Sequence, residues 1–185
     1  MRLAVEAADR VEGRTAPNPW VGAVVVGPGQ HEGAEPGHLA TGATAPPGGP
    51  HAEAAALESA GERARGGTLY VTLEPCNHQG RTPPCTAAVL ASGVRRVVIG
   101  MRDPDPRVDG SGIAALRDAG LTVDVGVGGA AVAEQLAPYV KQRRTGVPWV
   151  VLKLAGTLDG RIAMADGSSR WITGEAARRD AHRLR

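Results

Sequence analysis

The stretch GTLYVTLEPCNHQGRTPPCTAAVLASG, residues 67–93, holds the pattern that decides the fold. Its first seven residues are rich in β-branched, aromatic and aliphatic side chains and predict a strand. A turn-rich loop with two adjacent prolines follows, and the apolar run from Cys85 to Gly93 is typical of a short helix that closes on glycine. Cys76 and Cys85 are the only two cysteines among 185 residues, and both belong to this loop and its end.

The same alternation of strand and helix extends along the chain in both directions. Further helices are expected at residues 2–12, 51–61, 112–120 and 130–140, and further strands at residues 20–26, 94–100 and 121–127. After the basic cluster that ends at Arg144, a new strand is expected to open at Val147, and the chain is expected to end on a helix-like segment. The Gly- and Pro-rich residues 27–50 predict an edge hairpin followed by a mobile loop. Strands separated by helices of this length imply crossover connections, so we expect an α/β fold in which helices cover both faces of one sheet.

Composition limits where the protein works and what it binds. No apolar run approaches the roughly 20 residues that span a bilayer, and the amino terminus has no signal-peptide core. We therefore expect a cytoplasmic protein without membrane contact, whose thiols stay reduced, which makes a disulfide between the two cysteines unlikely to form. The net charge of +2 does not indicate nucleic-acid binding. The basic cluster at residues 141–144 is interpreted as a solvated helix end.

Two reduced thiols in a polar loop favour a metal site. Catalytic zinc takes three protein ligands and leaves one position open, so the two cysteines need one histidine. Of the five histidines, His51 is preferred because it follows Pro50 at the start of a helix, with Glu53 two residues further on. A structural zinc with His78 as a fourth ligand is the alternative, although structural sites usually show paired C-x₂₋₄-C spacing.

A zinc site of this kind beside a glutamate indicates a hydrolytic reaction. Zinc lowers the pKa of a bound water from about 15.7 to about 7, which makes a nucleophile at neutral pH. Attack on a ring carbon that bears an amino group then needs a group that moves a proton to the leaving nitrogen. Glu53, beside the predicted ligand His51, is placed for this task. Taken alone, a helix glutamate is more often solvated.

These motifs resemble a known family. His51-Ala52-Glu53 followed by Glu74-Pro75-Cys76 is similar to the zinc nucleobase-deaminase signature, H-x-E followed by P-C. Most members have C-x-x-C, whereas eight residues separate the thiols here. This long spacing resembles the pyrimidine deaminase of riboflavin biosynthesis, the amino-terminal half of RibD-type bifunctional proteins. The segments NPWVG, MRDPDP and SRWIT occur in that family's order.

The resemblance implies a fold, a reaction and a set of site residues. The implied fold of residues 1–146 is the three-layer cytidine-deaminase-like one with a mixed central sheet, and the implied substrate is diaminohydroxyphosphoribosylaminopyrimidine, a small pyrimidine ribonucleotide that loses one amino group. The implied zinc ligands are His51, Cys76 and Cys85, with one Zn²⁺ per chain, and the implied catalytic residue is Glu53. Implied substrate contacts come from Asn18, Arg81 and Asp103, each of which is otherwise an ordinary turn or loop residue.

Residues 147–185 resemble the start of a different domain, the NADPH-dependent reductase of the same proteins, which has a dihydrofolate-reductase-like fold. Ala155 and Trp171 match positions that contact the dinucleotide, and Ser169 and Arg185 match substrate positions. The remainder of such a domain, of order 150 residues, does not follow Arg185. We therefore expect NADPH binding only in a complete reductase domain and no reductase activity from this chain.

Several alternatives stay open. The stretch at residues 27–50 is longer than the family's usual connection, and a histidine that usually lines the pocket there is matched only loosely by His38. The family's DPNP is DPDP here, so Asp105 brings an acid near the expected phosphate and is predicted to weaken its binding. One alternative function is the deamination of another pyrimidine or purine nucleotide. The other alternative is a non-catalytic fragment that zinc stabilises. An unfinished second domain also suggests a homo-oligomer.

Overall fold

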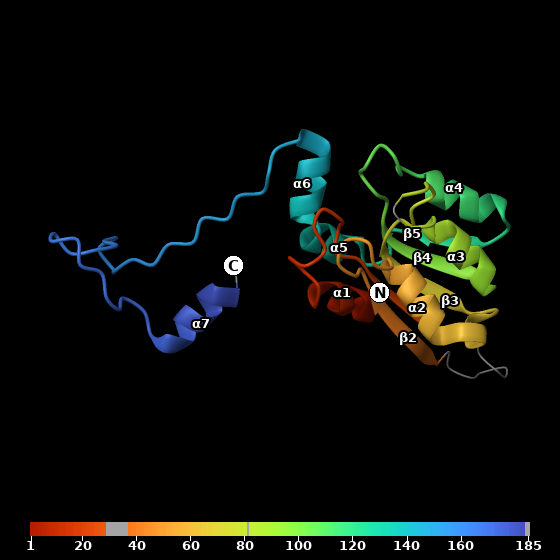
Figure 1. Cartoon of the computed structure of the whole chain (residues 1–185), viewed down its shortest axis with the longest axis horizontal. Coiled ribbons are helices and arrows are strands. Elements are labelled where there is room, and N and C mark those ends of the chain that lie inside the picture. Colours follow the sequence, from red (N-terminus) through yellow and green to blue (C-terminus); the bar gives the residue numbers. More distant parts are fainter. Residues whose placement is uncertain (29–36, 81, 184–185) are drawn as a thin grey trace. The chain divides into compact units, whose positions relative to one another are not determined.

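The computed structural model describes residues 1–28, 37–80 and 82–183, and Figure 1 shows the course of the chain. The chain forms two compact units, Met1–Pro148 and Trp149–Arg185. The first unit contains a sheet and its covering helices. The second is mostly turns and irregular segments and ends on α7 (Glu175–Arg183). The assignment of residues 1–146 to a deaminase and residues 147–185 to a reductase stays a prediction.

One five-stranded sheet forms the centre of the first unit, in the order β2-β1-β3-β4-β5. The strands are β1 (Gly22–Val26), β2 (His38–Ala43), β3 (Thr68–Leu73), β4 (Arg96–Met101) and β5 (Thr122–Val125). β1 runs antiparallel to both β2 and β3, whereas β3, β4 and β5 are parallel to one another. The parallel half follows from the crossover helices between its strands, and the antiparallel half follows from a hairpin.

Helices form a layer on each face of this sheet (Figure 1). On one face, α1 (Arg2–Asp9) packs on β1 and β2, and α5 (Gly129–Gln135) packs on β4. On the other, α2 (Ala52–Ala60), α3 (Cys85–Ser92) and α4 (Ser111–Asp118) lie side by side. A short 3-10 helix, Gly61–Ala64, extends α2, and α6 (Ala137–Thr145) follows α5. The predicted mixed sheet with helices on both faces is confirmed.

Small aliphatic side chains build the core because the chain contains no Phe. Leu69, Val71, Val97 and Ile99 are completely buried between the two helix layers. Short side chains let helices approach the sheet closely, and glycine occurs at points of very close contact. A Cβ at Gly42 of β2 would lie 2.3 Å from the carbonyl oxygen of Ala52, at the first residue of α2. The sequence therefore seats α2 directly on β2.

Three expectations about elements need correction. The single helix expected at residues 130–140 is divided into α5 and α6 at Leu136, because Pro138 lacks the N–H that would continue the helical hydrogen bonds. The strand expected after Gly146 is wrong: residues 147–156 form no strand in the described structure, which shows no partner strand for them. The hairpin expected within residues 27–50 begins earlier than expected: its first strand is β1, which ends at Val26, and only its second strand, β2, lies within these residues. Part of the loop expected to be mobile lies outside the described residues.

A substitution at Gly42 tests the close packing of α2 on β2. We expect Gly42→Ala to lower the free energy of unfolding by about 1–3 kcal/mol, because the new methyl group overpacks against the backbone of Ala52. Urea denaturation of the zinc-loaded protein measures the change. Gly37→Ala is the matched control, since a Cβ at Gly37 meets no atom within 4 Å. Equal stability of the two variants would contradict the packing argument.

Candidate metal and catalytic site

The first residues of helices α2 and α3 meet the end of the central strand β3 at one point. His51 is the residue before α2, with extended backbone angles of φ −75° and ψ 165°. Cys85 is the first residue of α3, and Cys76 lies three residues beyond the end of β3. Because α2 packs against α3, the three side chains come together although they are distant in sequence.

The ligand atoms of these three residues lie within 4.8 Å of one another. Nδ1 of His51 is 3.2 Å from Sγ of Cys85 and 3.7 Å from Sγ of Cys76. The backbone N–H of Cys85 also donates to Sγ of Cys76 over 3.4 Å, which fixes the loop between them. No disulfide joins the two cysteines.

This donor set fits a zinc ion. With Zn–S of about 2.3 Å and Zn–N of about 2.0 Å, tetrahedral geometry places sulfur and nitrogen ligands about 3.6 Å apart. The observed separations of 3.2 and 3.7 Å bracket that value. One imidazole and two thiols leave a fourth position open, which is the arrangement of catalytic rather than structural zinc. His78, the alternative fourth ligand, does not belong to this group of ligands.

Contacts between the ligands set their protonation. The hydrogen bond from Cys85 lowers the pKa of the Cys76 thiol to about 4, so Cys76 holds the thiolate of the pair. The same bond, with burial, raises the pKa of Cys85. The hydrogen bond with Cys76 raises the pKa of His51. A group of this kind exchanges its protons for a dication, because the ligands of zinc must be deprotonated.

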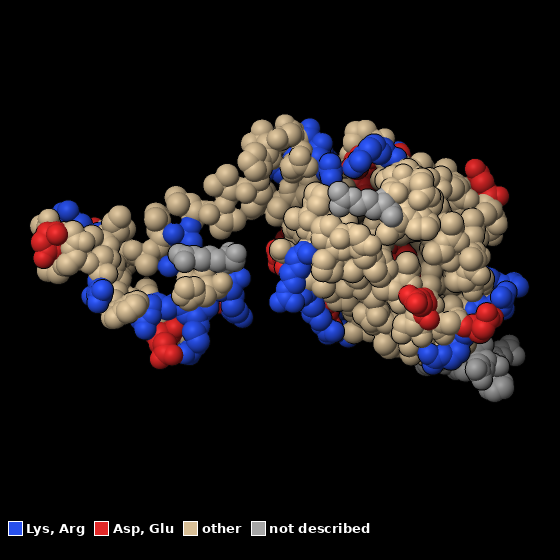
Figure 2. All heavy atoms as spheres, in the orientation of Figure 1, with Lys and Arg blue, Asp and Glu red and all other residues tan. Residues whose placement is uncertain are grey.

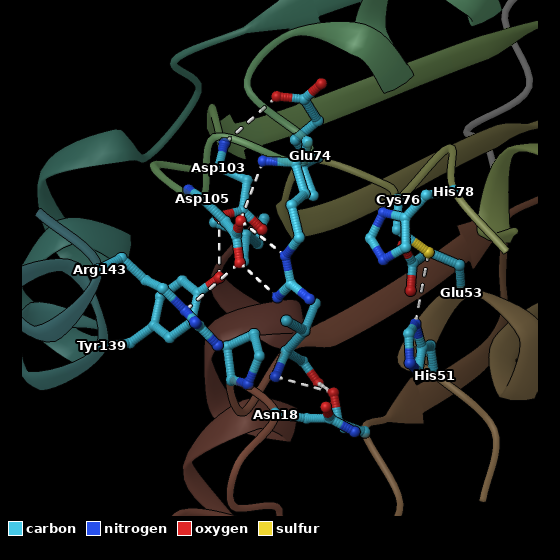
Figure 3. A pocket seen from close by; sticks show the side chains of 16 residues that line it. Asn18, His51, Glu53, Glu74, Cys76, His78, Asp103, Asp105, Tyr139 and Arg143 are labelled. Atoms are coloured by element: carbon cyan, nitrogen blue, oxygen red, sulfur yellow. Dashed lines mark hydrogen bonds and ion pairs between the residues drawn. The ribbon is translucent and has the colours of Figure 1, made fainter. Parts of the chain in front are cut away.

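Glu53 is buried in the first turn of α2, where it is 3% exposed. Burial raises the pKa of its carboxyl to about 7, because water is removed from the charged form. A carboxyl with this pKa gains and loses a proton readily near neutral pH, which suits a general acid and base. Figure 3 shows Glu53 beside His51 and Cys76 in the pocket.

His51, Cys76 and Glu53 line one end of a pocket with about 590 Å³ of empty space, part of it open to solvent. A neighbouring hollow of about 910 Å³ shares His51, Cys76 and His78 with it and is also lined by Gly48, Gly49 and Thr82. The two hollows are therefore contiguous beside the metal ligands. Their combined size accommodates a small ligand.

The other end of the pocket carries a charged network (Figure 3). The hydroxyl of Tyr139 donates to Oδ1 of Asp103 over 2.9 Å, and burial raises the pKa of the Asp103 carboxyl. Asp105 accepts from Arg107 over 2.7 Å and forms an ion pair with Arg143 at 3.5 Å. The hydrogen bond from Arg107 lowers the pKa of Asp105 to about 2, so Asp105 is charged at neutral pH.

Comparison with known proteins places this geometry in a family. Residues 1–101 match the model of the cytidine and deoxycytidylate deaminase zinc-binding region, and residues 148–185 match the RibD C-terminal domain. The chain belongs to the cytidine and deoxycytidylate deaminase family. Its RibD-type character, predicted from the cysteine spacing, is confirmed, and zinc is the cofactor of this deaminase domain.

Curated relatives and solved structures agree. The chain is 50% identical over 186 residues to the riboflavin biosynthesis protein RibD of Escherichia coli, and 48% identical over 194 residues to RibD of Aquifex aeolicus. These matches cover all of this chain and 48% and 50% of the relatives, so the chain spans about half their length.

Two solved structures share the fold over all of this chain. A diaminohydroxyphosphoribosylaminopyrimidine deaminase/5-amino-6-(5-phosphoribosylamino)uracil reductase from Thermotoga maritima has a TM-score of 0.89 at 45% identity, and this chain covers 51% of it. RibD of Acinetobacter baumannii has a TM-score of 0.87 at 44% identity, with 50% of its chain covered.

The deaminase pocket contains some of the predicted substrate residues and not others. Asn18 and Asp103 line it. Arg81 and Arg185 lie outside the described residues. Ser169 and Trp171 line a separate hollow within the second unit, and Ala155 is not among its lining residues. The Trp171 ring lies 4.1 Å from the Arg178 guanidinium carbon.

The interpretations of three residues are corrected. Arg143 is not simply part of a solvated helix end, because it lines the pocket and lies 5.3 Å from the centre of the Tyr139 ring. Asp105 does not present an unpaired acid to the pocket, since it is 4% exposed and paired with two arginines. His38 is exposed, contacts Thr41 and is not a lining residue.

Sequence reasoning also missed residues that the pocket brings together. Arg107 comes from the loop that begins with the MRDPDP segment, whereas Tyr139 and Arg143 come from α6, which carries no motif of its own. The position of Arg107 directly after RDPDP was the only signal available for any of them.

Removal of one thiol tests the metal site. We expect native mass spectrometry of the whole chain to show one zinc ion, and Cys85→Ser to lose it, because a serine hydroxyl is a poor ligand for zinc. Gln79→Ala, at an exposed position of the same loop, is the matched control and should keep its zinc. Retention of zinc by Cys85→Ser would exclude Cys85 as a ligand.

Proposed function

We propose that the chain catalyses the zinc-dependent hydrolytic deamination of diaminohydroxyphosphoribosylaminopyrimidine, an early step of riboflavin biosynthesis. The observation that carries this proposal is the convergence of His51, Cys76 and Cys85, two of which line one pocket together with the buried Glu53. The printed activity of the similar Thermotoga maritima protein supports the choice of substrate. The net reaction replaces a ring amino group with an oxygen from water and releases ammonia.

Each residue of the site has a defined task in this proposal. His51, Cys76 and Cys85 would hold zinc, which would supply a bound water with a pKa lowered to about 7. Glu53 accepts a proton from the attacking water and donates it to the leaving nitrogen, and its raised pKa suits both transfers. Burial of Glu53 removes competing bulk water from this exchange.

The pyrimidine ring is proposed to lie against Asn18, whose main chain is fixed on both sides. The N–H of Asn18 donates to the carbonyl of Thr15, and the hydroxyl of Thr15 donates to the carbonyl of Asn18, both over 2.9 Å. This double contact leaves the side-chain amide as the recognition group at the pocket wall. An amide offers both donors and an acceptor to the edge of an aminopyrimidine.

The phosphoribosyl end is proposed to lie toward Asp103 and the two arginines of the pocket. Arg107 and Arg143 contribute two positive charges and Asp105 one negative charge, so these three side chains together carry a net charge of +1, to which the neighbouring Asp103 adds a carboxyl whose pKa is raised by burial. Asp105 orients both guanidinium groups, which are well suited to binding phosphate. Arg81 is proposed to contact the same group from the loop that carries the cysteines.

Residues 147–185 are proposed to form the beginning of a reductase domain, in agreement with the match to the RibD C-terminal domain. Ala155 and Trp171 would then contact the dinucleotide, and Ser169 and Arg185 the substrate. NADPH binding would require a complete domain of this kind.

None of the described helices is long and apolar enough to cross a membrane. We also infer a cytoplasmic location and a homo-oligomeric state.

A single isosteric substitution tests the proton transfer. We expect Glu53→Gln to lower kcat for ammonia release by about 10²–10⁴-fold, because the amide cannot accept the proton. Zinc content should stay at one ion per chain. Glu58→Gln is the matched control, since Glu58 is an exposed residue of the same helix. Equal ammonia release from the Glu53 variant and the unchanged protein would refute a catalytic role.

Adjacent arginines of α6 offer a second test, directed at the phosphate. We expect Arg143→Ala to raise KM about tenfold, because a charge-assisted hydrogen bond to the phosphate is lost. Arg144→Ala should leave KM unchanged, since Arg144 is exposed and does not line the pocket. Steady-state kinetics of both variants, with the phosphorylated substrate and with its dephosphorylated form, measure how each arginine affects KM. Identical KM values for both variants would place the phosphate elsewhere.

A further inference from the structure

Glu74 is a buried carboxylate that neither the metal site nor the proton transfer uses. It follows β3 directly, is 3% exposed and precedes Cys76 by two residues. Its oxygens accept hydrogen bonds from backbone N–H groups. Oε2 accepts from Asp103 at 3.2 Å and from Gly110 at 3.0 Å, and Oε1 accepts from Gly112 at 3.0 Å and Ile113 at 3.2 Å. Two of the donors, Asp103 and Gly110, lie in the segment between β4 and α4, and the other two, Gly112 and Ile113, lie in the first turn of α4.

Two of these contacts cap α4 from outside the helix. The first-turn N–H groups of a helix have no acceptor within that helix. The residue before α4 is Gly110, at φ 92°, and it provides no side-chain cap. The carboxylate of Glu74 replaces the missing cap at Gly112 and Ile113, and its charge is favourable at the positive end of the helix.

The other two contacts fix the segment at residues 102–110, here called the substrate loop. Asp103, Asp105, Arg107 and Val108 of this loop line the pocket opposite the metal ligands. Figure 3 shows Glu74 beside Asp103, joined to it by a hydrogen bond. Glu74 therefore connects the strand end that carries a metal ligand to the loop that carries the charged network.

Close packing makes this connection tight. A Cβ at Gly112 would lie 1.9 Å from the carbonyl oxygen of Pro75, which lies between Glu74 and Cys76. On its outer side the loop is braced by Arg102, which donates to the carbonyl of Asp109 over 2.5 Å and pairs with its carboxylate at 3.0 Å. The start of α4 thus sits directly on the metal-binding segment.

We propose that Glu74 is a positioning residue that sets the distance between the metal site and the substrate loop, and so determines how tightly the phosphoribosyl end of the substrate is held. This inference rests on the proposed function. The four donors require four acceptor sites, which a carboxylate provides. A glutamine has one acceptor oxygen and would direct its own N–H groups at two of the donors.

Hydrogen exchange of the zinc-loaded whole chain tests the anchoring without any substrate. In Glu74→Gln we expect the amides of Asp103, Gly110, Gly112 and Ile113 to exchange at least about tenfold faster than in the unchanged protein, because charge-assisted hydrogen bonds are lost. Glu58→Gln is the matched control and should leave these rates unchanged. Unaltered exchange at all four amides in Glu74→Gln would overturn the proposal.

Kinetics separate positioning from a general loss of stability. We expect Glu74→Gln to raise KM at least about tenfold while kcat and zinc content stay nearly unchanged, because the substrate loop binds a part of the substrate remote from the reacting carbon. Gly112→Ala should show the same pattern, since it displaces α4 without removing the carboxylate. A loss of kcat with unchanged KM, or a loss of zinc, would overturn the positioning role.

The two measurements also separate this proposal from the proposed function. If the unchanged protein releases no ammonia, the proposed reaction fails, whereas the exchange rates still decide whether Glu74 anchors the loop. If Glu74→Gln does not fold, hydrogen exchange in the unchanged protein and the kinetics of Gly112→Ala decide whether Glu74 positions the substrate loop. In that case, the proposal would be overturned if the backbone amides of Asp103 and Gly110 in the unchanged protein exchanged as fast as the amide of the exposed Gly37.

Discussion

The meeting of two helix starts at the end of a central strand is the constraint on which the site depends. His51 precedes α2 and Cys85 begins α3, so a small displacement of either helix would separate the ligand atoms that now lie within 4.8 Å. The close packing of α2 against Gly42 and the short side chains of the core hold these helices in place. Dense packing of small residues therefore acts directly on metal binding.

Buried charges around the pocket are each compensated in a different way, which explains how one small domain holds so many of them. The carboxyl of Glu53 is driven toward its neutral form by burial, Glu74 is satisfied by backbone N–H groups, and Asp105 by two arginines. Uncompensated charges at these depths would be strongly destabilising. The acid at Asp105, where the resemblance implied an amide, is thus accommodated by its arginine partners.

Most of the fold was predictable from local patterns. The strands and helices of the first unit follow from periodicity and from glycine at helix ends, as at Gly61 and Gly93. The division at Leu136 was missed because an apolar helical pattern continues across Pro138. The strand expected after Gly146 was wrong because an apolar pattern alone forms no strand; it needs a hydrogen-bonding partner, and none is described for these residues.

The sequence by itself determined the chemistry of the metal site, because His-x-Glu and the two cysteines form a local signature whose residue types suit zinc. The family resemblance of the sequence also indicated Asn18 and Asp103, and tertiary structure decided the remainder of the pocket. Asp105, Arg143 and Tyr139 lie on a loop and a helix far apart in the chain, and only the packing of α6 beside the substrate loop brings them together. Which side chains face one cavity depends on how whole elements pack, and no short motif records that arrangement.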